Sequence, residues 1–214
     1  MSIIVTSKAN SNNFKNLHEK KLKRTESNES FSSLDSRNSN TKEDSNISEK
    51  NQIIFSFVKS VSEILIKLSL QEISLENEQY LKENKKLLKT FELKYIPDIT
   101  IEDYIIRIIN YSECEINTII CALIYIDRLC VKGIKINQKN IFKILFTSIL
   151  ISIKNNEDLF YNNQFYSQIA GVKTKELIKL EYNFCVLMEF DFFIDEKEFN
   201  KYFTAIQKAI ENCN

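Results

Sequence analysis

NIFKILFTSILISIK, residues 140–154, is the stretch that decides the fold of this chain. Apolar residues recur at helical spacing on several faces of the segment, so the pattern predicts a helix with almost no polar side. Such a helix must be enclosed by other helices or by a membrane. At about 1.5 Å per residue it spans only about 20 Å, whereas a bilayer core needs roughly 30 Å. We therefore expect it to be the central, buried helix of an all-α domain.

The polar residues of this segment indicate how the helix is used. Ser148 and Ser152 continue an apolar stripe, and their small side chains let neighbouring helices approach closely. We expect Asn137, which precedes the helix, to cap its first turn. Lys154 is the last residue of this segment and places a positive charge at the end of an apolar helix, which makes it a candidate functional residue.

The composition also favours helices. Hydrophobic residues make up 43% of the 214 residues, which is enough for a core, and only 2 glycines and 1 proline are present. Sandwiches and barrels need turn residues every few positions, so this scarcity disfavours them. The 29 basic and 29 acidic residues give zero net charge, so no whole-chain attraction to nucleic acid or to an acidic membrane is expected.

Residues that catalysis would need are scarce. The single histidine, His18, lies in a polar N-terminal region, and the 5 cysteines form no C-x-x-C motif. We expect these thiols to be reduced and mostly buried in an intracellular protein. So few glycines cannot form a P-loop or a dinucleotide fingerprint. We therefore expect neither an enzyme nor a bound metal or cofactor.

The chain divides into a polar tail and a helical body. Residues 1–48 are rich in Ser, Asn and charge and lack apolar periodicity, so we expect them to be disordered. The basic run at 20–24 is either a nuclear-targeting patch or an ordinary solvated segment. Helices are expected at about 52–68, 77–89, 100–110, 115–131, 164–170, 174–188 and 196–210.

Helix-ending and helix-capping residues support these boundaries. Pro97 stops one helical stretch, and Asp98 or Thr100 can cap the next one. Gly133 suits a left-handed C-cap, and Asp195 is expected to cap the last helix.

Three charged residues stand out against apolar surroundings. Asp127 lies deep in the apolar helix 115–131, and a buried carboxylate needs a partner. Both Arg107 and Arg128 are candidates for that partner. Glu181 interrupts an apolar stripe of helix 174–188, and Lys154 is fringed by apolar residues in the same way. The last two form a docking patch for another protein, or they are ordinary edge residues or a mutual surface ion pair worth about 0–1 kcal/mol.

Five pieces of the sequence together resemble a cyclin box. They are FELKYIPDITIEDYIIRI (91–108), ALIYIDRL (122–129), SILISIKNNED (148–158), YNNQFYSQIAGVKTKELIKLEYNF (161–184) and FDF (190–192). The first resembles the lead-in of the P-type cyclins, a group related to the yeast phosphate-pathway cyclins. The resemblance implies a five-helix bundle around a central buried helix, with flanking N-terminal and C-terminal helices. The expected domains are a tail (1–48), a helical extension (49–94), the cyclin box (95–194) and a C-terminal helix (195–214).

The resemblance also assigns roles to residues. In cyclins a lysine at the end of the central helix and a glutamate in the fifth contact the main chain of a kinase, and the matching residues are Lys154 and Glu181. Apolar positions that contact the kinase match Cys185, Phe190 and Phe192. Asp127 matches an internal salt-bridge residue, and we assign Arg107 as its partner.

The expected function is that of a regulatory subunit that binds and activates a cyclin-dependent Ser/Thr protein kinase. Two alternatives stay open, namely a cyclin-fold module that binds nucleic acid in transcription and a helical scaffold for a partner that is not a kinase. Zero net charge disfavours the first alternative. We expect no membrane partner and a location in the cytoplasm, the nucleus or both.

Overall fold

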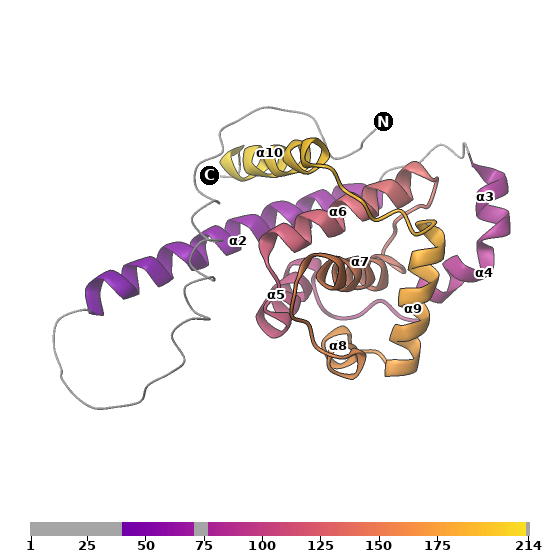
Figure 1. Ribbon diagram of the computed structural model, residues 1–214, viewed down its shortest axis with the longest axis horizontal. Helices are drawn as coiled ribbons and strands as arrows, with labels where there is room; N and C mark the ends of the chain where they lie inside the picture. The colour runs from indigo at the N-terminus through magenta and orange to yellow at the C-terminus, as the bar shows by residue number, and fades with distance from the viewer. Residues whose placement is uncertain (1–39, 71–76, 213–214) are drawn as a thin grey trace.

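The computed structural model describes residues 40–70 and 77–212, and within these ranges it contains helices and no strand (Figure 1). In chain order the helices are α2 (Asn40–Leu70), α3 (Glu78–Glu83), α4 (Lys85–Leu88), the 3-10 helix η1 (Lys89–Phe91), α5 (Ile101–Ser112), α6 (Ile116–Val131), α7 (Ile141–Asn156), α8 (Asn163–Ala170), α9 (Thr174–Leu187) and α10 (Glu196–Asn212). The all-α prediction is confirmed. No helix in these two ranges combines the length and the apolar character that crossing a membrane requires.

Helix α7 is the central helix that the opening stretch predicts. Figure 1 shows it end-on, with α5, α6, α8 and α9 around it, and its residues 144–153 are all buried. Its most extensive contact is with α6. Ser152 Oγ donates a hydrogen bond to the carbonyl of Thr118 in α6 at 2.7 Å, so a small side chain does bring these two helices close together.

The turn before α7 differs from the prediction. Asn140 is the N-cap residue, and neither it nor Asn137 caps the helix through a side chain, so the predicted Asn137 cap is wrong. Instead Asn137 Oδ1 accepts from the main-chain N–H of Lys139, and Asn140 Oδ1 accepts from that of Asn137. The two asparagines stabilise the turn itself, because their short side chains compete well for nearby main-chain groups.

The predicted helix caps at Thr100, Gly133 and Asp195 are confirmed. Thr100 Oγ1 accepts from the N–H of Asp103 at 3.0 Å and caps α5, and Asp195 Oδ1 accepts from the N–H of Glu198 at 2.7 Å at the start of α10. Gly133 follows α6 with φ of +89°, a conformation that a side chain would disfavour.

A carboxylate from the end of α7 caps the start of α6. The N-cap residue of α6, Glu115, makes no side-chain cap of its own. Glu157 Oε1 accepts from the Glu115 N–H at 3.1 Å and from Thr118 Oγ1 at 2.8 Å. A negative charge at a helix N-terminus is also favoured by the helix dipole. This contact therefore ties the two central helices together at one end.

Replacing that carboxylate is expected to destabilise the domain moderately. Glu157→Ala removes two accepted hydrogen bonds and a favourable charge, which should lower the free energy of unfolding by about 1–2 kcal/mol. The midpoint of urea unfolding measures this change. Asp158→Ala is the matched control, because this neighbouring side chain is exposed and should leave the midpoint unchanged. Equal midpoints for the two variants would contradict the assignment.

Helix α2 begins earlier than predicted. Residues 40–48, which we assigned to the tail, form its first part, and this part projects past the other helices (Figure 1). Apolar periodicity detects only the part of a helix that packs, which explains why the predicted start falls near residue 52. The remaining tail, including His18 and the basic run at 20–24, lies outside the described residues.

Two regions frame the central bundle. The predicted helix 77–89 is interrupted at Asn84, whose side-chain amide donates to the carbonyl of Tyr80, so the region forms α3, α4 and η1 instead. Helix α10 packs against α2 and α6. Residues 101–187, the core of the predicted box, thus contain α5 to α9.

Candidate functional site

Lys154 and Glu181 lie side by side on the surface where α7 meets α9. Lys154 is in the last turn of α7, and its ammonium group pairs with Glu181 Oε1 from the middle of α9. Their side chains are 24% and 20% exposed, so a partner could reach both. The two charges that the sequence singles out are therefore neighbours and pair with one another. Their contact with a kinase, which the resemblance implies, stays a prediction.

Asn163 joins this charged pair, and sequence reasoning missed it. Its Oδ1 accepts from Lys154 Nζ at 2.8 Å, and its Nδ2 donates to Glu181 Oε2 at 2.8 Å. Asn163 is the first residue of α8, and the preceding Asn162 caps that helix by accepting from the N–H of Phe165. The only signal in the sequence is a pair of adjacent asparagines, which is common at helix starts.

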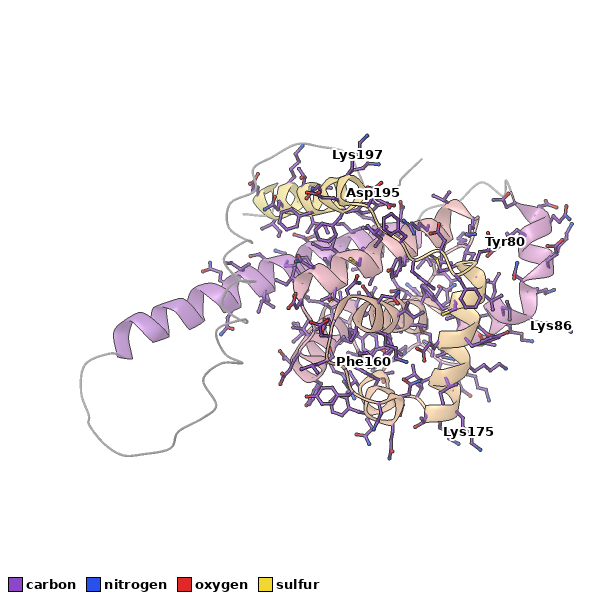
Figure 2. All side chains as sticks on the ribbon, in the orientation of Figure 1. Tyr80, Lys86, Phe160, Lys175, Asp195 and Lys197 are labelled. Atoms are coloured by element: carbon purple, nitrogen blue, oxygen red, sulfur yellow. The ribbon has the colours of Figure 1, made fainter. Side chains whose placement is uncertain are left out.

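Exposed apolar side chains occur on the two segments that carry Glu181 and Asn163. Ile178 and Tyr182 flank Glu181 on α9, and Leu159, Phe160 and Tyr161 precede Asn163 in the connection from α7 to α8, where Figure 2 labels Phe160. We call these five residues the apolar fringe. Leu159 is 85% exposed and Tyr182 is 63% exposed. Large apolar side chains gathered at one surface are typical of protein–protein contact sites.

The linker between α9 and α10, residues 188–195, carries further exposed aromatics. Phe190 is 66% exposed and Phe193, which sequence reasoning missed, is 79% exposed. Phe192 is half-buried, with its ring 5.3 Å from that of Tyr125 in an edge-to-face arrangement. Cys185, the remaining predicted contact residue, is half-buried one turn after Glu181.

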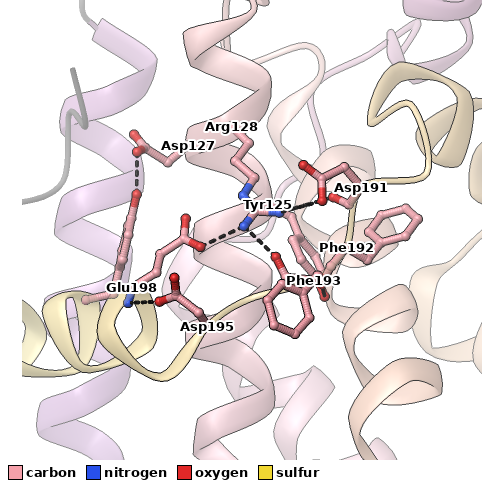
Figure 3. A network of polar contacts seen from close by, with 9 residues as sticks. Tyr125, Asp127, Arg128, Asp191, Phe192, Phe193, Asp195 and Glu198 are labelled. Atoms are coloured by element: carbon pink, nitrogen blue, oxygen red, sulfur yellow. Dashed lines mark hydrogen bonds and ion pairs between the residues drawn. The ribbon is translucent and has the colours of Figure 1, made fainter.

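Two side chains of α6 hold this linker in place. Arg128 donates to the carbonyls of Asp191 and Phe193 and pairs with Glu198 of α10 at 2.7 Å (Figure 3). The Tyr125 hydroxyl donates to the carbonyl of Phe192 at 3.0 Å. Three successive linker carbonyls are therefore bound by residues one helical turn apart. This arrangement fixes the positions from which the linker aromatics project.

The backbone at the start of the linker is strained. Glu189 and Phe190 have φ of +56° and +58°, a left-handed conformation that costs side-chain-bearing residues on the order of 1–3 kcal/mol each. An ion pair between Lys132 and Glu189 at 2.5 Å helps to hold this turn. The N–H groups of Glu189 and Phe190 donate to the carbonyls of Val186 and Cys185, the pattern of a helix that ends in left-handed residues.

Asp127 and Arg107 do not form the salt bridge that we predicted. Arg107 donates to the carbonyls of Ile169 and Gln168 at the end of α8, at 3.0 and 3.1 Å, because the carbonyl end of a helix attracts cations. Asp127 is buried and accepts a hydrogen bond from the Tyr202 hydroxyl of α10. Its structural role is therefore to join α6 to α10.

A cleft of about 580 Å³ lies between the end of α7 and the linker before α10. Its walls include Cys121 of α6, Asn155 at the end of α7, the linker residues Phe192 and Phe193, and Phe199 of α10. Polar residues also line it, namely Asn156, Asp195 and Glu196. A hollow with such walls can receive an apolar side chain of a partner.

The cysteines give this surface a chemical probe. Burial raises the pKa of the Cys121 thiol to about 11, and burial together with Asp127 raises the pKa of Cys130 to about 12. Burial and the nearby Glu181 also raise the pKa of Cys185, which is however the most accessible of the three. Since the thiolate is the reactive form, all three should react slowly at neutral pH.

We expect iodoacetamide at pH 8 to modify Cys185 before Cys121 and Cys130 in the native protein. A raised thiol pKa leaves less thiolate below that pKa, so raising the pH towards 10 should speed the reaction of Cys185. Peptide mapping by mass spectrometry measures the order in which the cysteines are modified. Unfolding in urea should abolish the difference in rate between them. Faster modification of the fully buried Cys130 than of Cys185 would contradict the described packing.

Comparisons with known proteins agree with the resemblance. A family model described as cyclin matches residues 9–192. Cyclin-U4-1 of Arabidopsis thaliana is 35% identical over 116 residues, which are 53% of this chain and 57% of that protein. Cyclin-U4-2 of the same plant is 32% identical over 146 residues, 66% of this chain and 67% of that protein. Cyclin-P3-1 of Oryza sativa subsp. japonica is 32% identical over 113 residues, 52% of this chain and 48% of that protein.

The family match covers the bundle and the charged pair. The chain spans little more than half of the length of Cyclin-U4-1 and about half of that of Cyclin-P3-1. The family match runs from the N-terminal region to Phe192 of the linker, over most of the chain. It therefore contains α7, α9 and the side chains of Lys154, Asn163 and Glu181. The prediction from the sequence is confirmed, and the chain belongs to the cyclin family.

Proposed function

We propose that the chain is a regulatory subunit that binds and activates a cyclin-dependent Ser/Thr protein kinase. The observation that carries the proposal is the partly exposed Lys154–Glu181 pair, together with the apolar fringe. Membership of the cyclin family supports it. The chain itself supplies no catalytic group, and the complex works in the cytoplasm, the nucleus or both.

The surface offers a partner both apolar area to bury and polar groups that fix its orientation. Burial of the apolar fringe contributes roughly 25 cal/mol per Å² of apolar area removed from water. The charged pair and its neighbours hydrogen-bond the main chain of the kinase and thereby orient it. Phe190 and Phe193 extend the contact beyond the charged pair, towards the roughly 1,000 Å² that a specific interface needs.

Activation is a shift of population in the kinase. A protein kinase is active when the lysine of its β3 strand pairs with the glutamate of its mobile αC helix. The chain binds that helix in the active orientation more tightly than in the inactive one, which shifts the equilibrium towards the active form. A hundredfold shift requires about 2.7 kcal/mol of difference in binding free energy.

The test uses the full chain as bait in a lysate of the cells that produce it. A proline-directed Ser/Thr kinase should be recovered, and the purified chain should raise that kinase's phosphorylation of a peptide substrate at least tenfold. If the recovered partners include no kinase, the chain is instead a helical scaffold for a partner of another class. Salt-sensitive binding of duplex DNA, with no kinase recovered, would favour the nucleic-acid alternative.

A further inference from the structure

Lys154, Asn163 and Glu181 form a closed ring of hydrogen bonds. Lys154 Nζ donates to Asn163 Oδ1 at 2.8 Å, Asn163 Nδ2 donates to Glu181 Oε2 at 2.8 Å, and Lys154 Nζ donates to Glu181 Oε1. Each side chain contacts both others, so none can rotate away without breaking two hydrogen bonds. The ring fixes the spacing of the two charges more tightly than an isolated surface ion pair would.

The three members come from three helices. Lys154 ends α7, Asn163 begins α8 and Glu181 lies within α9. Helix α8 is anchored by its Asn162 cap and by the buried Tyr166, whose hydroxyl accepts from the N–H of Tyr161. The amide of Asn163 is therefore held by a fixed helix start, and the ring joins the end of α7 and the start of α8 to the middle of α9.

The hydrogen-bonding groups left over define what the ring can recognise. An ammonium group has three N–H donors, of which one remains, and the asparagine amide retains one of its two N–H donors. Each carboxylate oxygen of Glu181 keeps a lone pair. Main-chain carbonyl groups of a partner can accept from these remaining donors, and main-chain N–H groups can donate to the carboxylate.

We propose that Asn163 is a positioning residue, which holds Lys154 and Glu181 at the spacing that their contacts with the main chain of the kinase require. The inference rests on the proposed function, because it names how the same surface selects its partner. It adds the neutral residue Asn163 to the pair of charges that the proposed function already uses.

The main test is the nearly isosteric substitution Asn163→Asp. The introduced carboxylate still accepts from Lys154 but faces Glu181 as a like charge, so the ring opens. An acidic residue in the first turn of α8 is favourable for the helix, so the variant should fold. We expect it to bind the kinase that the wild type recovers about tenfold more weakly. Gln164→Ala, at an exposed neighbouring position, is the matched control and should bind like the wild type.

A rescue experiment separates positioning from folding. Asn163→Asp combined with Glu181→Gln exchanges the amide and the carboxylate between the two positions, so the ring can close again with the same net charge. This double variant should bind the kinase about threefold or more tightly than Asn163→Asp alone. Thermal unfolding midpoints of all variants are measured in parallel. A purely structural role of Asn163 predicts parallel changes in midpoint and affinity, whereas positioning predicts rescued affinity at an unchanged midpoint.

The outcomes distinguish this inference from the proposed function. Recovery of no kinase by the wild type overturns both. Equal kinase binding by the wild type and Asn163→Asp, or no rescue in the double variant, overturns only the positioning role. The affinity of the wild type should change less than about threefold between low and physiological salt, and a steeper fall overturns recognition of the main chain.

Discussion

Lys154→Ala combined with Glu181→Ala is expected to weaken kinase binding about a hundredfold or more. Truncating hydrogen-bonded charges at the centre of an interface costs about 2–5 kcal/mol, because the partner's polar groups lose their contacts and stay desolvated. The folded chain should lose less than about 1 kcal/mol of unfolding free energy, since the variant removes both members of a partly exposed pair together. Surface plasmon resonance with the purified kinase measures the affinity.

The chain provides a matched control for this variant. Glu176 also lies on α9 and pairs with a lysine of α7, Lys143, at 2.8 Å, but it lies outside the ring. Glu176→Ala should therefore change kinase affinity less than about threefold. If Glu176→Ala and the double variant weaken binding equally, the loss reflects general disturbance of the α7–α9 contact and the surface assignment fails.

Phe184→Ala is expected to have the largest effect on stability. This side chain is fully buried in α9, and its ring centroid lies 6.3 Å from that of Phe91 in an edge-to-face arrangement. Removing a buried phenylalanine leaves a cavity and costs about 3–5 kcal/mol. That cost is a large part of the roughly 5–15 kcal/mol that stabilises a typical domain. The urea midpoint should fall accordingly, and kinase activation should fall with it.

Phe190→Ala tests the same residue type in the linker. Its side chain is 66% exposed, so truncation should change the unfolding free energy by less than about 1 kcal/mol. If the linker contacts the kinase, Phe190→Ala should nevertheless weaken binding. The two variants thus separate folding from docking, and equal urea midpoints for them would contradict the described core.

The helices could be predicted from the sequence because their burial leaves a periodic signal. Helix α7 is apolar on all faces since neighbours enclose it, and Pro97, Thr100 and Asp195 mark helix ends through local chemistry. The break at Asn84 was missed, because an asparagine within a weak helical pattern carries no strong stop signal. The proximity of Lys154 and Glu181 was suggested by their apolar surroundings and by the family resemblance.

The contacts that define the site could not be predicted in the same way. Asn163 meets Lys154 and Glu181 only because the end of α7 and the start of α8 lie against the middle of α9, and no local pattern encodes that arrangement. Arg107 and Arg128 bind main-chain carbonyls, which every residue type carries. The sequence therefore shows two cations near a buried carboxylate but does not show that backbone acceptors compete for them.

Residues 190–194, FDFFI, have the composition of segments that assemble into intermolecular β-structure. Such assembly requires a row of main-chain carbonyls available to a second chain. Here the carbonyls of Asp191, Phe192 and Phe193 already accept hydrogen bonds from Arg128 and Tyr125. Helix α6 thereby protects the segment from fibril-like stacking, while the rings of Phe190 and Phe193 remain free to meet another surface.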